Sequence, residues 1–278
     1  GRNIKFYVKD ETTNKILGLI CLGSDVISIK VRDSWIGWTK KDKLEDGLLN
    51  HTAICSTICS TQPLGYNFLG GKLIATMVNS KVVRDEWEKI YGQKLVGFST
   101  TSLYGIHSMY NGIPHWKGLG ESTGRIGLKP DDEYYEKWHD WIKKNRADEY
   151  EKKIKSKGGK SGPVTGIKQR ILSIIFNEIG LSQSKYQHGF KRGVFFSELY
   201  DNTRPFLRGE IKEDELVLKK RLDNDVESIV YWWQKKSLKR YFKLHEQGRL
   251  KPEMLFYADM IGKSWEDAKE KYLGEVGR

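Results

Sequence analysis

The chain has 278 residues, 38% of them hydrophobic and 12% aromatic, which is enough apolar material for a folded core and excludes disorder as a description of the whole. It carries 48 basic and 36 acidic residues, a net charge of +12, and no apolar run of about 18 residues that would predict a membrane-spanning helix. Its three cysteines are too few for a disulfide framework and lack the spacing of a zinc site, so we expect buried thiols in a reducing cytosol.

The first 130 residues are predicted to mix strands and helices. Apolar runs predict strands over 4–8, 16–22, 26–31, 52–59 and 94–101, the first two paired as a hairpin, and one more strand within 102–127. Helices are expected over 40–49 with Thr39 as N-cap, over 66–79, and over 81–91 with Gly92 ending the helix. This succession predicts an α+β domain.

The rest of the chain is predicted to be mainly helical. Helices are expected over 131–155, 167–179 and 226–244, followed by a last helix capped by Ser264. The glycine-rich segment 157–163 is the clearest linker. We therefore divide the chain into a domain over 1–130, a helix and basic linker over 131–163, and a helical C-terminal domain over 164–278.

Positive charge is concentrated in residues 146–192, where 11 basic residues stand against four acidic ones, a local excess of +7. Such a stretch attracts a polyanion by counterion release whatever its sequence, although a solvated helix face followed by a flexible linker has the same composition. The stretch thus indicates a nucleic acid as partner. The residues expected to contact it are Lys152, Lys153, Lys155, Lys157, Lys160, Lys168, Arg170, Lys191 and Arg192.

Three other features have residue types suited to a site. The turn Gly65–Lys72 lacks the Lys-Ser/Thr of a phosphate loop, but a strand, a turn and a helix N-terminus in succession suit a phosphate as well as close helix–sheet packing. Trp35 and Trp38 are suited to stacking on a base or to covering the edge of a core. Tyr110 follows a predicted strand, where a phenol can act as a general acid. The histidines lack metal-ligand spacing, and we predict no metal site.

Several motifs resemble one family in their order and spacing over residues 1–127. They are Gly18, Arg32-Asp33-Ser34-Trp35-Ile36-Gly37-Trp38, Asn67-Phe68-Leu69-Gly70-Gly71-Lys72, Trp87 with Tyr91-Gly92, Thr100-Thr101, Tyr110, and Trp116 through Arg125. This succession resembles the DruA-like family, which belongs to Druantia anti-phage defence systems and is also found in phages and near transposases. Residues 190–278 resemble the C-terminal extension of a phage-type branch.

The same layout is similar to the Mom DNA-modification protein and, more distantly, to GNAT acyltransferases. That resemblance implies a GNAT-like mixed sheet domain followed by a mainly helical C-terminal region. Thr52–Cys59 would be the central strand that splays away from its neighbour. Acetyl-CoA or another acyl-CoA is the implied cofactor, with its phosphates bound by Asn67, Gly70 and Gly71 at the start of the next helix.

The resemblance also implies roles for the remaining candidates. Tyr110 would serve as the general acid, and Arg32 and Asp33 would position the target base or the incoming group. Trp35 and Trp38 would stack on a base flipped out of the DNA.

The leading hypothesis is therefore a Mom-like, base-modifying enzyme of the acyltransferase type that acts in phage defence or in a phage. The alternative is a non-catalytic DNA-binding component on a degenerate GNAT scaffold, because the Arg/Gln-x-x-Gly-x-Gly/Ala signature is absent. A third reading is an interaction protein with no nucleic-acid role. The expected partners are DNA and other defence-system or phage proteins in the cytoplasm of a bacterial host, and no membrane. The family's upstream His-Tyr-Leu-Gly segment has no counterpart here, so we expect the chain to be the interior of a longer one.

Overall fold

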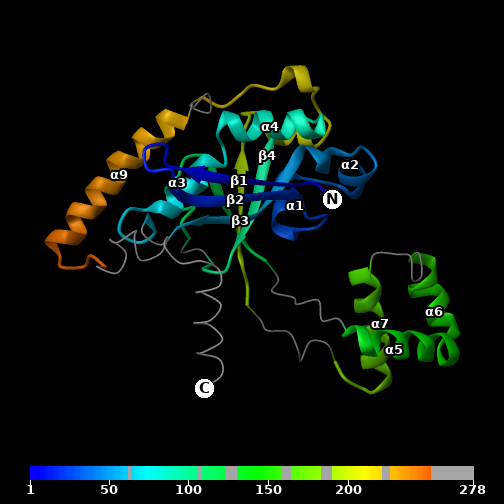
Figure 1. Ribbon diagram of the computed structural model, residues 1–278. Coiled ribbons are helices and arrows are strands. Elements are labelled where there is room, and N and C mark those ends of the chain that lie inside the picture. The colour runs from blue at the N-terminus through cyan, green and yellow to red at the C-terminus, as the bar shows by residue number, and fades with distance from the viewer. Residues whose placement is uncertain are drawn as a thin grey trace, which may run out of the picture. The chain divides into compact units, whose positions relative to one another are not determined.

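The computed structural model describes residues 1–61, 64–105, 108–122, 130–157, 164–182, 190–220 and 226–251 (Figure 1). The chain forms two compact units, which are described separately. The first consists of Gly1–Ser122 together with Arg192–Arg278, and the second of Thr123–Lys191.

A six-stranded mixed sheet forms the centre of the first unit. Its strands are β1 (Asn3–Lys9), β2 (Ile16–Ser24), β3 (Thr52–Ser60), β4 (Gly97–Ser102), β5 (Trp116–Glu121) and β6 (Gly193–Glu198). They lie in the order β1-β2-β3-β4-β6-β5, with β3 and β4 parallel and the other neighbours antiparallel. The α+β class and the mixed sheet are thus confirmed.

Helices cover both faces of this sheet. They are α1 (Lys30–Ile36), α2 (Lys40–Leu44), α3 (Gly70–Met77), α4 (Lys81–Tyr91), α8 (Thr203–Leu207) and α9 (Val226–Glu246), with the short 3-10 helices η1 (Leu48–His51) and η6 (Glu213–Glu215). The Trp116 indole N–H donates to Ala75 of α3, whereas the Lys117 ammonium lies over the Trp35 ring of α1. Successive side chains of a strand point to opposite faces, so α3 and α1 pack on opposite faces of the sheet.

Local sequence signals explain several helix ends. Thr39 caps α2 through a capping box with Asp42, and α4 ends at Gly92, which has a left-handed φ of 64°. The strand expected over 26–31 is wrong, because helix α1 begins at Lys30. In the preceding loop the side chains of Val26 and Ile27 are exposed, so their β-branched character reflects neither a strand nor a core.

The second unit is a helical insertion with its own core. It contains α5 (Asp132–Asn145), α6 (Ala147–Lys153), the 3-10 helix η3 (Lys155–Lys157) and α7 (Val164–Glu178). Five isoleucines are its buried core, namely Ile142, Ile154, Ile167, Ile171 and Ile174. The single helix expected over 131–155 is interrupted at Arg146, whose extended φ of −137° separates α5 from α6.

This insertion interrupts a β-hairpin. The chain leaves the first unit after β5 and returns at β6, and the Ser122 N–H donates to the carbonyl oxygen of Arg192 at 2.8 Å. The division therefore differs from the boundaries expected at 130 and 163, and the C-terminal region contributes strand β6 to the sheet as well as helices. The expected linker residues 158–163 and the helix capped by Ser264 lie outside the described residues.

Candidate functional site

The two parallel strands separate soon after they begin. Their register covers three pairs and ends at Ile54 with Ser99. Just beyond this point the Thr100 hydroxyl donates to the Cys55 carbonyl oxygen at 2.9 Å. A β-bulge lies at the same level, because Cys55 and Thr57 face consecutive residues of β2 and leave Ser56 without an opposite residue. Bulges commonly re-aim strand groups beside functional sites.

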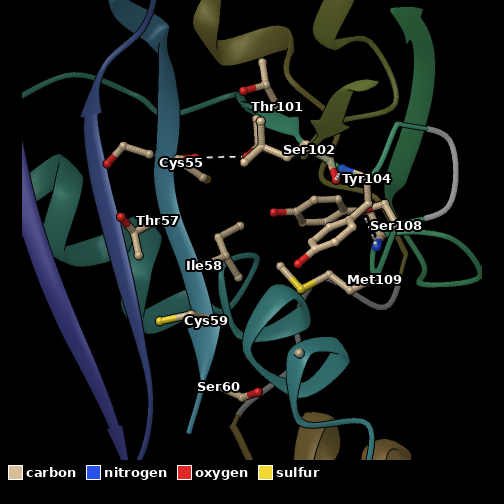
Figure 2. Close-up of a pocket in the computed structure, with 15 residues that line it drawn as sticks. Cys55, Thr57, Ile58, Cys59, Ser60, Thr101, Ser102, Tyr104, Ser108 and Met109 are labelled. Atoms are coloured by element: carbon tan, nitrogen blue, oxygen red, sulfur yellow. Dashed lines mark hydrogen bonds between the residues drawn. The ribbon is translucent and has the colours of Figure 1, made fainter. Parts of the chain in front are cut away.

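A pocket of about 620 Å³ lies where β3 and β4 diverge. Figure 2 shows Cys55, Thr57, Ile58 and Cys59 on one side, and Ser102 and Met109 on the other. The full lining consists of residues 55–60, Gly71, residues 100–104 and residues 108–110. Its volume lies in the range of small-molecule sites.

Tyr110 is a buried titratable group of this lining. Its ring is 5% exposed and packs against Trp116 and Phe195, with 5.0 Å between ring centroids in each pair. Burial raises the pKa of Tyr110 to about 12, although a hydrogen bond with Thr100 acts in the opposite direction. The phenol therefore keeps its proton at neutral pH.

Two cysteines of β3 also belong to the lining of the pocket. Cys55 is buried, and burial followed by the nearby charge of Asp25 raises its pKa well above the usual value. Cys59 is exposed on the same strand and lines the pocket, so the expectation of buried thiols holds for Cys55 and is wrong for Cys59.

The N-terminus of α3 reaches the same pocket through Gly71. A Cβ on Gly70 would lie 2.5 Å from the Leu64 carbonyl oxygen, and one on Gly71 would lie 2.9 Å from the Met109 sulfur. Gly70 donates its N–H to Gly65, and the Lys72 ammonium donates to the carbonyl oxygens of Met109 and Asn111. Gly70 therefore packs against backbone, while Gly71 faces the pocket.

Asn67 lies elsewhere, in a structural position. Its side chain is fully buried, and its amide donates to the Lys251 carbonyl oxygen at 3.0 Å and accepts from the Lys251 N–H at 3.1 Å. The amide thus ties the loop before α3 to the chain after α9.

Arg32 and Asp33 belong to a buried ion-pair network rather than to the pocket lining. The fully buried Arg32 guanidinium donates to Asp25 at 2.7 Å, to Asp33 at 2.7 and 2.9 Å, and to the Val26 carbonyl oxygen at 2.7 Å. The second Asp33 oxygen accepts from Lys43 at 2.6 Å. Every nitrogen of the guanidinium is therefore engaged within the protein.

The two candidate stacking residues also have protein partners. Trp38 is buried, its indole N–H donates to Leu207, and the Arg32 guanidinium lies 5.1 Å from its ring centroid. Trp35 packs on Phe196 at 5.6 Å, with Arg204 4.8 Å from the ring centroid. Neither ring is among the residues that line the pocket.

The basic residues singled out from the sequence differ in burial and in their partners. Lys153 and Lys155 pair with Glu149 and Glu151 one helical turn away. Lys168 is buried, pairs with Asp132 and lies 5.1 Å from the Tyr135 ring centroid. The others in the described chain are the exposed Lys152, Lys157, Lys191 and Arg192 and the half-buried Arg170, while Lys160 lies outside it.

A different group of cations was missed by the sequence analysis. It is the cationic flank of α9, which we define as Lys235, Lys236, Lys239, Arg240 and Lys243. Their spacing at i, i+4 and i+8 in a predicted helix was the signal that was available. The flank adjoins α3, because Arg240 donates to the Tyr66 carbonyl oxygen at 2.9 Å and the Trp233 indole donates to Phe68.

Within the described ranges, no three His, Cys, Asp or Glu side chains come together as a metal site requires. The same ranges contain no helix with the length and apolar character needed to cross a bilayer.

Fold and site together define an α+β protein with a ligand-sized pocket between two diverging parallel strands. The family described as Druantia protein DruA matches residues 1–209, and the chain belongs to this family. It is 28% identical over 236 residues to the Druantia protein DruA of Escherichia coli (strain UMEA 4076-1). The aligned region covers 78% of this chain and 55% of that protein. The chain thus spans about half the length of this curated relative. No solved structure matches. The similarity to Mom proteins and GNAT acyltransferases stays a prediction.

Proposed function

We propose that this chain is part of an anti-phage defence protein that transfers an acyl group to a base of DNA. The pocket between β3 and β4 supports this best, because it unites an open strand edge, a helix N-terminus and a protonated phenol. The defence context comes from the family, whose named member is a Druantia protein.

The residues of the pocket suit an acyl-CoA in two respects. Backbone pairing of β3 with β4 ends at Ile54, and the Cys55 carbonyl oxygen accepts from the Thr100 hydroxyl. The backbone groups of β3 beyond Cys55 are therefore placed to bind an amide-containing arm. Gly71 and the start of α3 are placed to hold phosphates. Gly70 and Asn67 are left out of this role, since their polar groups are engaged within the protein.

An acyl-CoA, when bound, supplies an activated thioester. The exocyclic amine of a base would attack its carbonyl carbon, and the proton that the amine loses would pass to water, which restores the proton of the catalytic acid. The C–S bond would break, and the leaving sulfur would take a proton from that acid. Tyr110 is suited to give that proton, because its phenol stays neutral in a buried position on the pocket wall.

The test compares Tyr110→Phe with Tyr104→Phe. Both tyrosines line the pocket, but Tyr104 is exposed and Tyr110 is buried. Nucleosides from DNA incubated with the protein and acyl donors are analysed by mass spectrometry. We expect Tyr110→Phe to lower turnover by about 100-fold or more with unchanged donor affinity, and Tyr104→Phe to leave it unchanged. Unmodified DNA with every donor would refute the proposal.

Donor binding has its own readout in titration calorimetry of the full chain with acyl-CoA, where the proposed function predicts a heat of binding. The absence of a heat of binding would favour the second candidate. That candidate is a non-catalytic DNA-binding component, and the cationic flank of α9 is the observation that favours it.

A further inference from the structure

We infer that the cationic flank of α9 binds a single strand of nucleic acid and leads it toward the pocket. The inference rests on the proposed function only for what happens to a base in the pocket.

Except at its two ends, α9 carries charge of one sign. Residues 228–245 contain five Lys or Arg residues and no Asp or Glu. At about 100° per residue the five cations fall within about 140° of the helix circumference, so they share one side of α9. Residues 235, 239 and 243 form a row with steps of about 6 Å along the axis.

The aromatic contacts that these cations make do not neutralise their charge. Lys235 lies 4.2 Å from the Tyr231 ring centroid, and Lys236 lies 5.3 Å from that of Trp232. Arg240 lies 4.8 Å from the ring centroid of Tyr66. Aromatic faces orient a cation without cancelling its charge, so the side of α9 stays positive.

Two exposed aromatic side chains of α9 identify the kind of partner. Tyr231 and Phe242 are 60% and 59% exposed, next to the cations on the helix surface. Cations interleaved with exposed aromatic rings match a strand whose phosphates need neutralising and whose unpaired bases need stacking. A duplex keeps its bases stacked internally and an acidic peptide has no rings of this kind, so neither uses both features.

The position of the flank gives the direction of the strand. Arg240 donates to the Tyr66 carbonyl oxygen in the loop before α3, and the Lys72 ammonium on α3 donates to the carbonyl oxygen of Met109, a lining residue. In accord with this geometry, burial, followed by the charges of Lys236 and Arg240, lowers the pKa of Lys72. Lys72 follows Gly71, which lines the pocket. The positive surface therefore continues from α9 to the pocket beside α3.

The experiment measures binding of a fluorescent oligothymidylate to the full chain by anisotropy over a range of salt, with no acyl donor present. The variant is Lys235→Gln, Lys239→Gln and Lys243→Gln together. The matched control neutralises three exposed lysines of α1 and α2, namely Lys30→Gln, Lys40→Gln and Lys41→Gln. Circular dichroism verifies that both proteins are folded.

We expect the flank variant to bind about 100-fold more weakly at about 0.1 M salt and its salt slope to fall by about 2, which corresponds to three lost phosphate contacts. The control should bind like the parent. Equal losses in both variants, or tighter binding of a duplex or of polyglutamate than of the single strand, would overturn the inference. Tyr110→Phe should bind the oligonucleotide normally. Loss of binding in the flank variant alone would therefore support this inference independently of the proposed chemistry.

Discussion

Replacing Arg32 by Met tests whether the buried ion-pair network holds the fold or serves chemistry. The guanidinium makes the four hydrogen bonds described above to Asp25, Asp33 and Val26, and the side chains of Arg32 and Asp25 are both 0% exposed. Methionine keeps most of the volume but leaves Asp25 as a buried charge whose remaining contacts are the Ser99 hydroxyl and the Val26 N–H.

The magnitude follows from this burial. Removing one partner of a buried ion pair costs about 3–5 kcal/mol, since the other charge stays desolvated. That is a large part of the roughly 5–15 kcal/mol by which folded domains are stable. The pair of Lys81 with Asp85 is the control, because its side chains are 65% and 57% exposed and Lys81→Met should cost about 0.5 kcal/mol or less.

Urea unfolding followed by tryptophan fluorescence measures both variants. Adding Asp25→Asn to Arg32→Met removes the stranded charge, so the double variant should recover at least about 1 kcal/mol relative to the sum of the single changes. If Arg32→Met stays within about 1 kcal/mol of the parent, the network does not hold the fold. The role expected for Arg32 in positioning a base would then regain support.

The other predictions concern the pocket and the insertion. Burial raises the pKa of Tyr110 from 10.0 to about 12, so the neutral phenol stabilises the fold below pH 10 and this stabilisation is lost as pH rises toward 12. In urea unfolding, the parent should lose about 1.4 kcal/mol more of its free energy of unfolding than Tyr110→Phe between about pH 9 and pH 11. Equal losses in the two proteins would contradict this. Gly70→Ala should destabilise the protein by about 1–3 kcal/mol, because the new Cβ would meet backbone atoms of Leu64. Gly71→Ala should destabilise it by less, because the new Cβ would meet the flexible side chain of Met109. Thermal melts that reverse this order would be evidence against the packing described. Replacing residues 123–191 by a short turn should leave the sheet folded, since Ser122 already bonds to Arg192, and a protein without β-sheet circular dichroism would disprove it.

Features set by neighbouring residues could be predicted from the sequence. Helix α4 was expected over 81–91 and spans Lys81–Tyr91, because its apolar face and the terminal Gly92 are local signals. The strand predicted for the β-branched run at 26–31 is wrong because residues outside the run determine its structure. Arg32 must reach back to Asp25, and the helix that carries it ends the extended run at Ile29.

Features that depend on long-range pairing could not be predicted from the sequence. Strand β6 was missed because its partners β4 and β5 lie far away in the sequence. Tyr110 was proposed from a family resemblance, but only the tertiary structure places its ring on Phe195 and against the pocket. Asn67 and Trp38 show the reverse case, in which residues that suit a ligand are engaged by backbone groups far along the chain.

The insertion between β5 and β6 has a consequence for folding during synthesis. Strand β5 joins the sheet through β6, and Gly97 of β4 pairs with Glu198, about 100 residues later. A nascent chain that ends before residue 193 has no β6, so β5 has no place in the sheet and Tyr110 lacks the ring of Phe195. The β3–β4 hydrogen bonds can form earlier, yet the wall of the pocket is completed only after the whole helical insertion has been made.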